Sequence, residues 1–162
     1  AKLQSNLVYL LKESGMMNCP AFYRDGKFIV AVLAGIPVVW LLHGWIPVFS
    51  SNLTLHWTLL LSVLIWQPLI EELLFRGIIQ GQLSKSNWGQ QARFRITAAN
   101  IVTSVLFVAM HMLNSSPTWS LAIFIPSIFY GYFRDTFNSV YPAMLLHSVY
   151  NLTVVIGLVI YR

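Results

Sequence analysis

The chain has 162 residues, of which 57% are hydrophobic and only 9% are charged. A soluble domain carries about 25% charged residues, so this composition excludes water as the main solvent of the protein surface. The net charge of +5 comes from lysines and arginines spread among the ends of apolar segments, which indicates membrane topology and excludes a basic nucleic-acid-binding patch. A single cysteine excludes an internal disulfide bond.

The elements predicted from the apolar pattern are one amphipathic segment and five helices. Residues 1–27 are expected to form an N-terminal juxtamembrane or interfacial segment. Five apolar stretches follow, each near the roughly 20 residues that a membrane-spanning helix needs, although the fourth is short. They are 28–49, 53–70, 96–113, 119–133 and 140–161. Because backbone groups in lipid must be satisfied within the segment, the sequence predicts an all-α, polytopic membrane bundle of about five transmembrane helices, in one domain over 1–162.

Basic residues lie on alternate connections between these stretches. They precede the first stretch, lie between the second and third, and lie between the fourth and fifth, whereas 50–52 and 114–118 contain none. By the positive-inside rule, this pattern predicts a multi-pass protein with a cytoplasmic N-terminus. The lipid bilayer is therefore an expected partner, and the cluster of Lys85, Arg93 and Arg95 is expected to contact anionic lipid.

Two adjacent acids, Glu71 and Glu72, follow the second apolar stretch. Apolar residues recur beyond them, so the helix is predicted to continue to about Leu83, which puts Glu71 about 18 Å inside its cytoplasmic end. Glu72 and Arg76, four residues apart, are expected to form an ion pair. Glu71 points about 100° away without a partner on this helix, which makes it a candidate general base. If the helix ended at Ile70, both acids would be ordinary surface charges.

Polar residues also mark the third and fifth stretches. In the third they recur every three or four residues and should face the bundle interior, ending at His111 about 24 Å from the cytoplasmic end. This stripe comprises Thr97, Asn100, Ser104, Phe107 and His111. In the fifth stretch, His147 and Asn151 lie four residues apart and share a helix face, with His147 about 12 Å from the cytoplasmic end. The two side chains either stabilise a common oxyanion or join two helices by hydrogen bonds. The similar depths allow all these groups to meet in one buried place.

Three motifs follow one another on successive apolar helices: Glu71-Glu72-x-x-x-Arg76-Gly77, Phe107-x-x-x-His111 and His147-x-x-x-Asn151. In this order they resemble the CAAX protease and bacteriocin-processing family, the Abi or Rce1-like glutamic intramembrane proteases. The resemblance covers about residues 53–151, which would form the catalytic helical core. Ser127-x-x-x-Gly131 is also similar, as a small-xxx-small helix contact.

The resemblance implies an intramembrane endopeptidase and assigns a role to each motif residue. Glu71 would be the general base, His111 its partner on the attacking water, and His147 with Asn151 the oxyanion site. Structural or substrate-binding roles would fall to the other two polar residues of the first motif, Glu72 and Arg76. The resemblance further implies a compact prokaryotic member of the inner or cell membrane, which processes a membrane-anchored peptide or protein during maturation or at a C-terminal sorting signal.

A metal is not required by this pattern. One glutamate and two histidines could supply three zinc ligands, but asparagine is a poor zinc ligand and no HExxH motif is present. The sequence therefore favours a metal-free mechanism, with zinc as the minority interpretation and no other cofactor.

Two alternatives remain open at this point. A non-enzymatic membrane immunity or scaffold protein would keep its function after Glu71→Gln and His147→Ala. A small proton-coupled transporter would use Glu71, His111 and His147 as a proton relay and would show solute flux without peptide cleavage.

Overall fold

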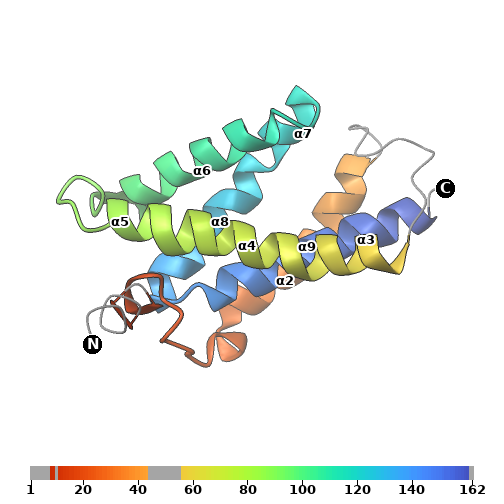
Figure 1. Ribbon diagram of the computed structural model, residues 1–162. Coiled ribbons are helices and arrows are strands. Elements are labelled where there is room, and N and C mark those ends of the chain that lie inside the picture. Colours follow the sequence, from red (N-terminus) through yellow and green to blue (C-terminus); the bar gives the residue numbers. More distant parts are fainter. Residues whose placement is uncertain (1–7, 10, 44–55, 161–162) are drawn as a thin grey trace.

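The computed structural model describes residues 8–9, 11–43 and 56–160, and this part of the chain is almost entirely helical (Figure 1). The end of the predicted first stretch, and residues 1–7 and 10 of the predicted N-terminal segment, lie outside the described residues. The all-α class is confirmed, with one two-residue-per-strand hairpin as the exception.

The elements follow the predicted stretches closely. In chain order they are η1 (Phe22–Arg24), α2 (Gly26–His43), α3 (Trp57–Leu61), the π-helical η2 (Ser62–Trp66), α4 (Gln67–Glu72), the π-helical η3 (Leu73–Gln80), α5 (Gly81–Leu83), β1 (Ala92–Arg93), β2 (Ile96–Thr97), α6 (Ala98–His111), α7 (Pro117–Ala122), α8 (Phe124–Phe137) and α9 (Tyr141–Ile160). The segments from α3 to α5 form one continuous helix of 27 residues, Trp57–Leu83, called the long helix below.

Within the described residues, two helices are long and apolar enough to cross a membrane, the long helix and α9. The apolar part of α2 and the 14 residues of α6 are shorter. The predicted count of five spanning helices therefore stays a prediction.

The predicted fourth stretch is not one helix, because it turns at Ile123 between α7 and α8. Pro126 explains the break, since it has no N–H to bond the carbonyl of Ala122 and its ring crowds that carbonyl in a continuous helix. Ser116 accepts a hydrogen bond from the Trp119 N–H and caps the start of α7, with Pro117 in the first turn.

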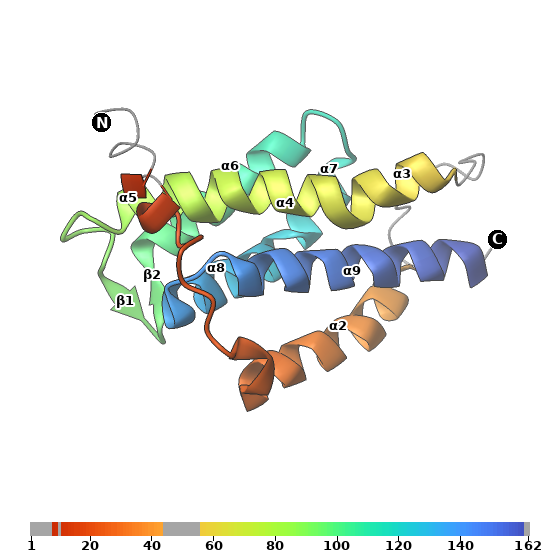
Figure 2. The ribbon, with the colours of Figure 1, turned by 60° about the horizontal axis from the view of Figure 1, so that its bottom comes forward.

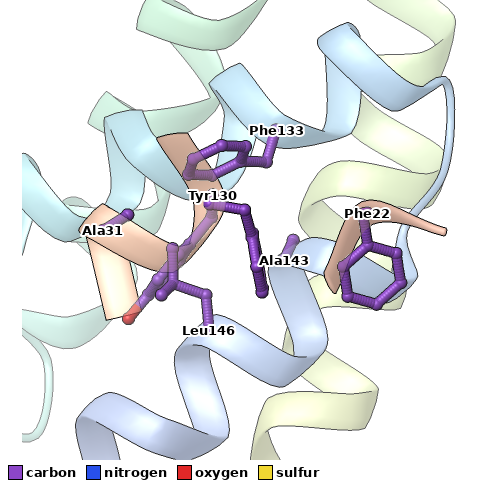
Figure 3. Close-up of a cluster of buried hydrophobic side chains, with 7 residues drawn as sticks. Phe22, Ala31, Tyr130, Phe133, Ala143 and Leu146 are labelled. Atoms are coloured by element: carbon purple, nitrogen blue, oxygen red, sulfur yellow. The ribbon is translucent and has the colours of Figure 1, made fainter. Parts of the chain in front are cut away.

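The long helix and α9 lie side by side, with α6 and α8 on one side of the pair and α2 packed on α9 (Figures 1 and 2). A cluster of buried apolar side chains lies where η1, α2, α8 and α9 meet (Figure 3). That core consists of Phe22, Phe28, Ala31, Tyr130, Phe133, Ala143 and Leu146. This core lies next to the polar residues of the long helix and packs α8 and α9 against η1 and α2.

The long helix presents an apolar face outward and a polar face inward. Its outward side chains are large, exposed and spaced by four residues: Trp66, Ile70, Leu74 and Ile78. Its inward side chains at the same spacing, Glu72, Arg76 and Gln80, are fully buried. This arrangement suits a helix with lipid on one side and protein on the other.

Close contact between α8 and its neighbours depends on Gly131. A Cβ at this position would collide with the side-chain amide of Asn100 on α6. The Gly131 carbonyl accepts a hydrogen bond of 3.0 Å from Gln80 Nε2 on the long helix. These contacts confirm the Gly131 part of the predicted small-xxx-small contact.

Candidate active site

The long helix continues through Glu71 and Glu72 to Leu83, as the sequence predicted. The two carboxylates therefore lie inside the helical bundle and do not end a helix. They stand immediately before the π-helical segment η3, in which each N–H bonds five residues back. Such segments are frequent at functional sites because they shift side chains around the helix axis.

Glu72 is the centre of a buried polar network. Its Oε2 lies 3.3 Å from Arg76 Nε, and both side chains are fully buried. Its Oε1 lies 2.8 Å from His147 Nδ1 on α9. The predicted ion pair of Glu72 and Arg76 is confirmed, and His147 is a third member that the sequence did not reveal.

Arg76 has contacts of three further kinds, with Ser127, with two aromatic rings and with Arg134. Its Nη2 donates hydrogen bonds to the carbonyl of Ser127 at 2.9 Å and to its Oγ at 2.7 Å. Its guanidinium lies over the rings of Phe107 and Tyr130, 5.3 and 5.9 Å from their centroids. Arg134 Nε donates to the Arg76 carbonyl at 3.1 Å. Arg76 thus links the long helix to α6 and α8. Its charge is paired with the Glu72 carboxylate, while its buried Nη1 has no hydrogen-bond partner among the described residues.

Glu71 points toward the two histidines and not toward Arg76. Its Oε2 lies 3.8 Å from His111 Nε2 and 4.0 Å from His147 Nε2. These distances are too long for direct hydrogen bonds. The side chains of Glu71 and His111 are 21% and 22% exposed and that of His147 is 8% exposed, so the group is partly exposed, although Glu71 Oε2 itself is buried.

The other nitrogen of each histidine is already bound. His111 Nδ1 lies 2.9 Å from the Phe107 carbonyl, which only accepts, so Nδ1 carries the proton. His147 Nδ1 likewise donates to the Glu72 carboxylate. Both Nε2 atoms therefore face Glu71, and each is an acceptor when its ring is neutral. A carboxylate–histidine contact of this kind fixes the orientation of the ring.

Asn151 stands one helical turn after His147 on α9 and is partly buried. Its Nδ2 donates a hydrogen bond of 2.9 Å to the Val63 carbonyl on the long helix. Val63 belongs to the other π-helical segment, η2. The contact joins two helices, which is one of the two roles that the sequence allowed. Within the described residues, the second N–H of the amide has no acceptor.

The described residues contain no group of three or more His, Cys, Asp or Glu side chains that could hold a metal ion. The separations of 3.8 and 4.0 Å between Glu71 and the histidines also exceed the roughly 3.3 Å between tetrahedral zinc ligands that bond lengths of about 2.0–2.1 Å imply. The preference for a metal-free mechanism stays a prediction.

Sequence reasoning did not identify Gln80 and Arg134 as parts of the site's support. Gln80 follows Glu72 and Arg76 at a spacing of four, so the buried polar stripe was visible in the sequence. Arg134 was treated only as a topological charge, yet it is buried and also contacts the Asp135 carboxylate at 3.2 Å.

The apolar helical bundle indicates a membrane protein. Its candidate site contains a carboxylate and two histidines, which are groups able to carry out acid–base chemistry. The family model described as type II CAAX prenyl endopeptidase Rce1-like matches residues 52–153, which include every predicted site residue. The chain therefore belongs to the Rce1-like family of integral membrane endopeptidases, which act on membrane-associated peptides. No curated protein and no solved structure matches the chain.

Proposed function

We propose that this protein is a glutamic intramembrane endopeptidase, in which Glu71 activates the water that hydrolyses a peptide bond of a membrane-anchored peptide or protein. The observation that carries the proposal is the convergence of Glu71 Oε2 on the Nε2 atoms of His111 and His147 at 3.8 and 4.0 Å, in a partly open site. Family membership supports the reaction class.

The attacking water is positioned by two acceptors. Glu71 Oε2 and His111 Nε2 are 3.8 Å apart, a separation at which one water donates a hydrogen bond to each. The water then directs a lone pair away from both. Glu71 removes a proton from it as its oxygen attacks the substrate carbonyl carbon, and the carbonyl π electrons move to the oxygen.

The resulting oxyanion is stabilised by His147 Nε2–H and by the second N–H of the Asn151 amide. Because the Nδ1–H of His147 already donates a hydrogen bond to Glu72, donation from Nε2 as well requires the doubly protonated imidazolium. Charge balance supports this state. The carboxylates of Glu71 and Glu72 and the guanidinium of Arg76 together carry one net negative charge. The second proton on the His147 ring neutralises that charge.

Product formation returns the proton that Glu71 accepted. The tetrahedral intermediate collapses, the bond between carbon and nitrogen breaks, and protonated Glu71 delivers its proton to the leaving nitrogen. The products are a carboxylic acid and an amine, and the site returns to its initial protonation. Glu72 and Arg76 take no proton in this scheme. They hold His147 in place and shield its charge.

The proposed substrate is a membrane-anchored peptide or protein that is cut during maturation or at a C-terminal sorting signal. The family description names prenyl endopeptidases. For this chain, the partly exposed side of Glu71 and His111 supports entry of an extended peptide segment between helices of the bundle.

The test compares membrane peptides in cells that produce the wild type, Glu71→Gln or Glu13→Gln. Glu13 is a matched control because its carboxylate forms an exposed ion pair with Lys85, away from the site. We expect one peptide to accumulate uncut with Glu71→Gln only. Loss of solute flux with no uncut peptide would contradict the proposal.

A second test addresses the metal. Purified enzyme should retain cleavage of that peptide after exhaustive chelation. Activity that disappears on chelation and returns with zinc alone would overturn the metal-free mechanism.

A further inference from the structure

The hairpin before α6 has an unusual turn. Its strands pair antiparallel, with Arg93 opposite Ile96, and only Phe94 and Arg95 connect them. Both turn residues have positive φ angles, 54° and 66°. A two-residue turn of this kind favours asparagine and glycine, because a left-handed backbone costs other residues roughly 1–2 kcal/mol each. This hairpin instead has a large aromatic residue and an arginine there.

The tip makes little contact with the rest of the described chain. The Phe94 side chain is 86% exposed. The Arg93 guanidinium lies 5.4 Å from the Phe94 ring centroid. Arg93 and Arg95 are exposed, and within the described residues neither forms an ion pair. Apart from the local contact of Arg93 with the Phe94 ring, the exposed tip shows no buried packing within the described residues that would hold this strained turn, and strained backbone clusters at functional sites.

The base of the hairpin is held firmly. The backbone N–H groups of Ala98 and Ala99 donate to the carbonyls of Gln91 and Gly89 at 2.8 and 3.1 Å. Thr97 caps α6 and its hydroxyl donates to the Asp135 carboxylate of α8 at 2.7 Å. Because the base of the hairpin is fixed and its tip is exposed, the turn residues are available to bind a partner outside the chain.

The hairpin lies where the long helix ends and α6 and α9 begin (Figure 2). The positive-inside pattern assigns this end to the cytoplasmic face. The tip therefore stands at the level where the acyl region of a bilayer meets its headgroups. At that level an apolar surface and phosphate groups lie within a few ångströms of each other.

We propose that Arg93, Phe94 and Arg95 form a docking tip for anionic lipid. The Phe94 ring enters the boundary of the acyl region, and the two guanidiniums bind lipid phosphates. Lipid fits better than an acidic protein because a single exposed ring with two arginines is far smaller than a stable protein interface. Lipid also satisfies the ring and both charges together.

The proposal concerns the attachment of this end of the bundle and does not depend on the cleavage chemistry. Its test is a thermal unfolding titration of the full chain in detergent, with phosphatidylglycerol or phosphatidylcholine added. The variants are Arg93→Gln with Arg95→Gln, Phe94→Gly, and the control Arg24→Gln, which removes an exposed arginine of η1.

We expect phosphatidylglycerol, and not phosphatidylcholine, to raise the unfolding temperature of the wild type. The double arginine variant should need about 25-fold more phosphatidylglycerol for the same rise, about fivefold for each charge. Phe94→Gly should start at a higher unfolding temperature, because glycine relieves the turn, and yet respond less to the lipid. Arg24→Gln should respond as the wild type does.

An unchanged lipid titration in the double arginine variant would overturn the proposal. So would an equal loss of response in Arg24→Gln, since the effect would then be general to positive charge. A rise produced by an acidic peptide and not by phosphatidylglycerol would overturn it in favour of a protein partner. If the double variant fails to fold, Phe94→Gly alone decides, because a full lipid response there contradicts insertion of the ring.

Discussion

Glu71 and Glu72 are neighbours on one turn of the long helix, yet their carboxylates have opposite surroundings. Glu72 is fully buried and contacts Arg76 at 3.3 Å and His147 at 2.8 Å. Glu71 is 21% exposed and faces two histidine nitrogens at 3.8 and 4.0 Å without a direct hydrogen bond to either. A rotation of about 100° between successive residues separates the two environments.

This difference is what the proposed mechanism requires, with Glu72 as the supporting carboxylate and Glu71 as the reactive one. Burial of an ion pair stabilises little by itself, but removal of one member leaves an isolated charge in an apolar interior. A carboxylate that is held near two histidine nitrogens without being bound to them can exchange a proton with a water molecule beside it. Substitutions at these two residues and at the contacts around them test whether the two carboxylates differ in this way.

Glu71→Gln should abolish most activity and leave stability unchanged. Glutamine has the same shape but cannot accept the proton of the attacking water, so we expect a loss of about 10²- to 10⁴-fold in kcat. Cleavage of a labelled peptide in proteoliposomes measures the rate, and thermal unfolding measures stability. A lowered unfolding temperature equal to that of Glu72→Gln would instead make Glu71 a structural residue.

Glu72→Gln should mainly reduce stability. It leaves the buried Arg76 charge without its carboxylate, and breaking a buried pair costs about 3–5 kcal/mol. Replacement of both members, Glu72→Leu with Arg76→Met, should recover much of that loss because no isolated charge remains. Activity of the double variant should stay low, since His147 has lost the acceptor of its Nδ1 proton. Equal stability of the single and double variants would contradict this interpretation.

Asn151→Ala distinguishes an oxyanion donor from an interhelical contact. If the free N–H of Asn151 stabilises the oxyanion, kcat should fall about 10²- to 10³-fold with little change in KM. If the hydrogen bond to Val63 is its whole role, the change should appear as about 1 kcal/mol of stability, with kcat nearly constant. Kinetics and unfolding of the same preparation separate the two outcomes.

Gly131→Ala should change stability without acting on the chemistry, with a loss of about 1–3 kcal/mol from overpacking against Asn100. Gly26→Ala is the matched control, because a Cβ there meets no atom within 4 Å. The control should unfold within about 0.5 kcal/mol of the wild type. Two glycine variants of equal stability would show that the contact of α8 and α6 adjusts freely.

Local spacing predicted much of the site. The separation of four residues predicted the Glu72–Arg76 pair, and the apolar residues after Glu72 predicted that the helix continues to Leu83. The polar stripe of the third stretch was also correct, since Asn100, Ser104 and Phe107 are buried. These features follow from helix geometry alone, so one sequence suffices to find them.

Contacts between distant segments could not be predicted in this way. Glu72 and His147 are 75 residues apart, and no spacing rule orients one helix about another. The π-helical segments depend on packing and leave no clear pattern in the sequence. Pro126, by contrast, was a visible signal that the fourth stretch is broken, and its missing N–H gives the physical reason.

The most direct test of the central claim is the cleavage rate per folded molecule, compared between Glu71→Gln and Glu72→Gln. We expect Glu71→Gln to be fully folded and almost inactive, and Glu72→Gln to lose most of its activity by unfolding and to keep more activity per folded molecule. Wild-type cleavage by folded Glu71→Gln would contradict the assignment of Glu71 as the general base.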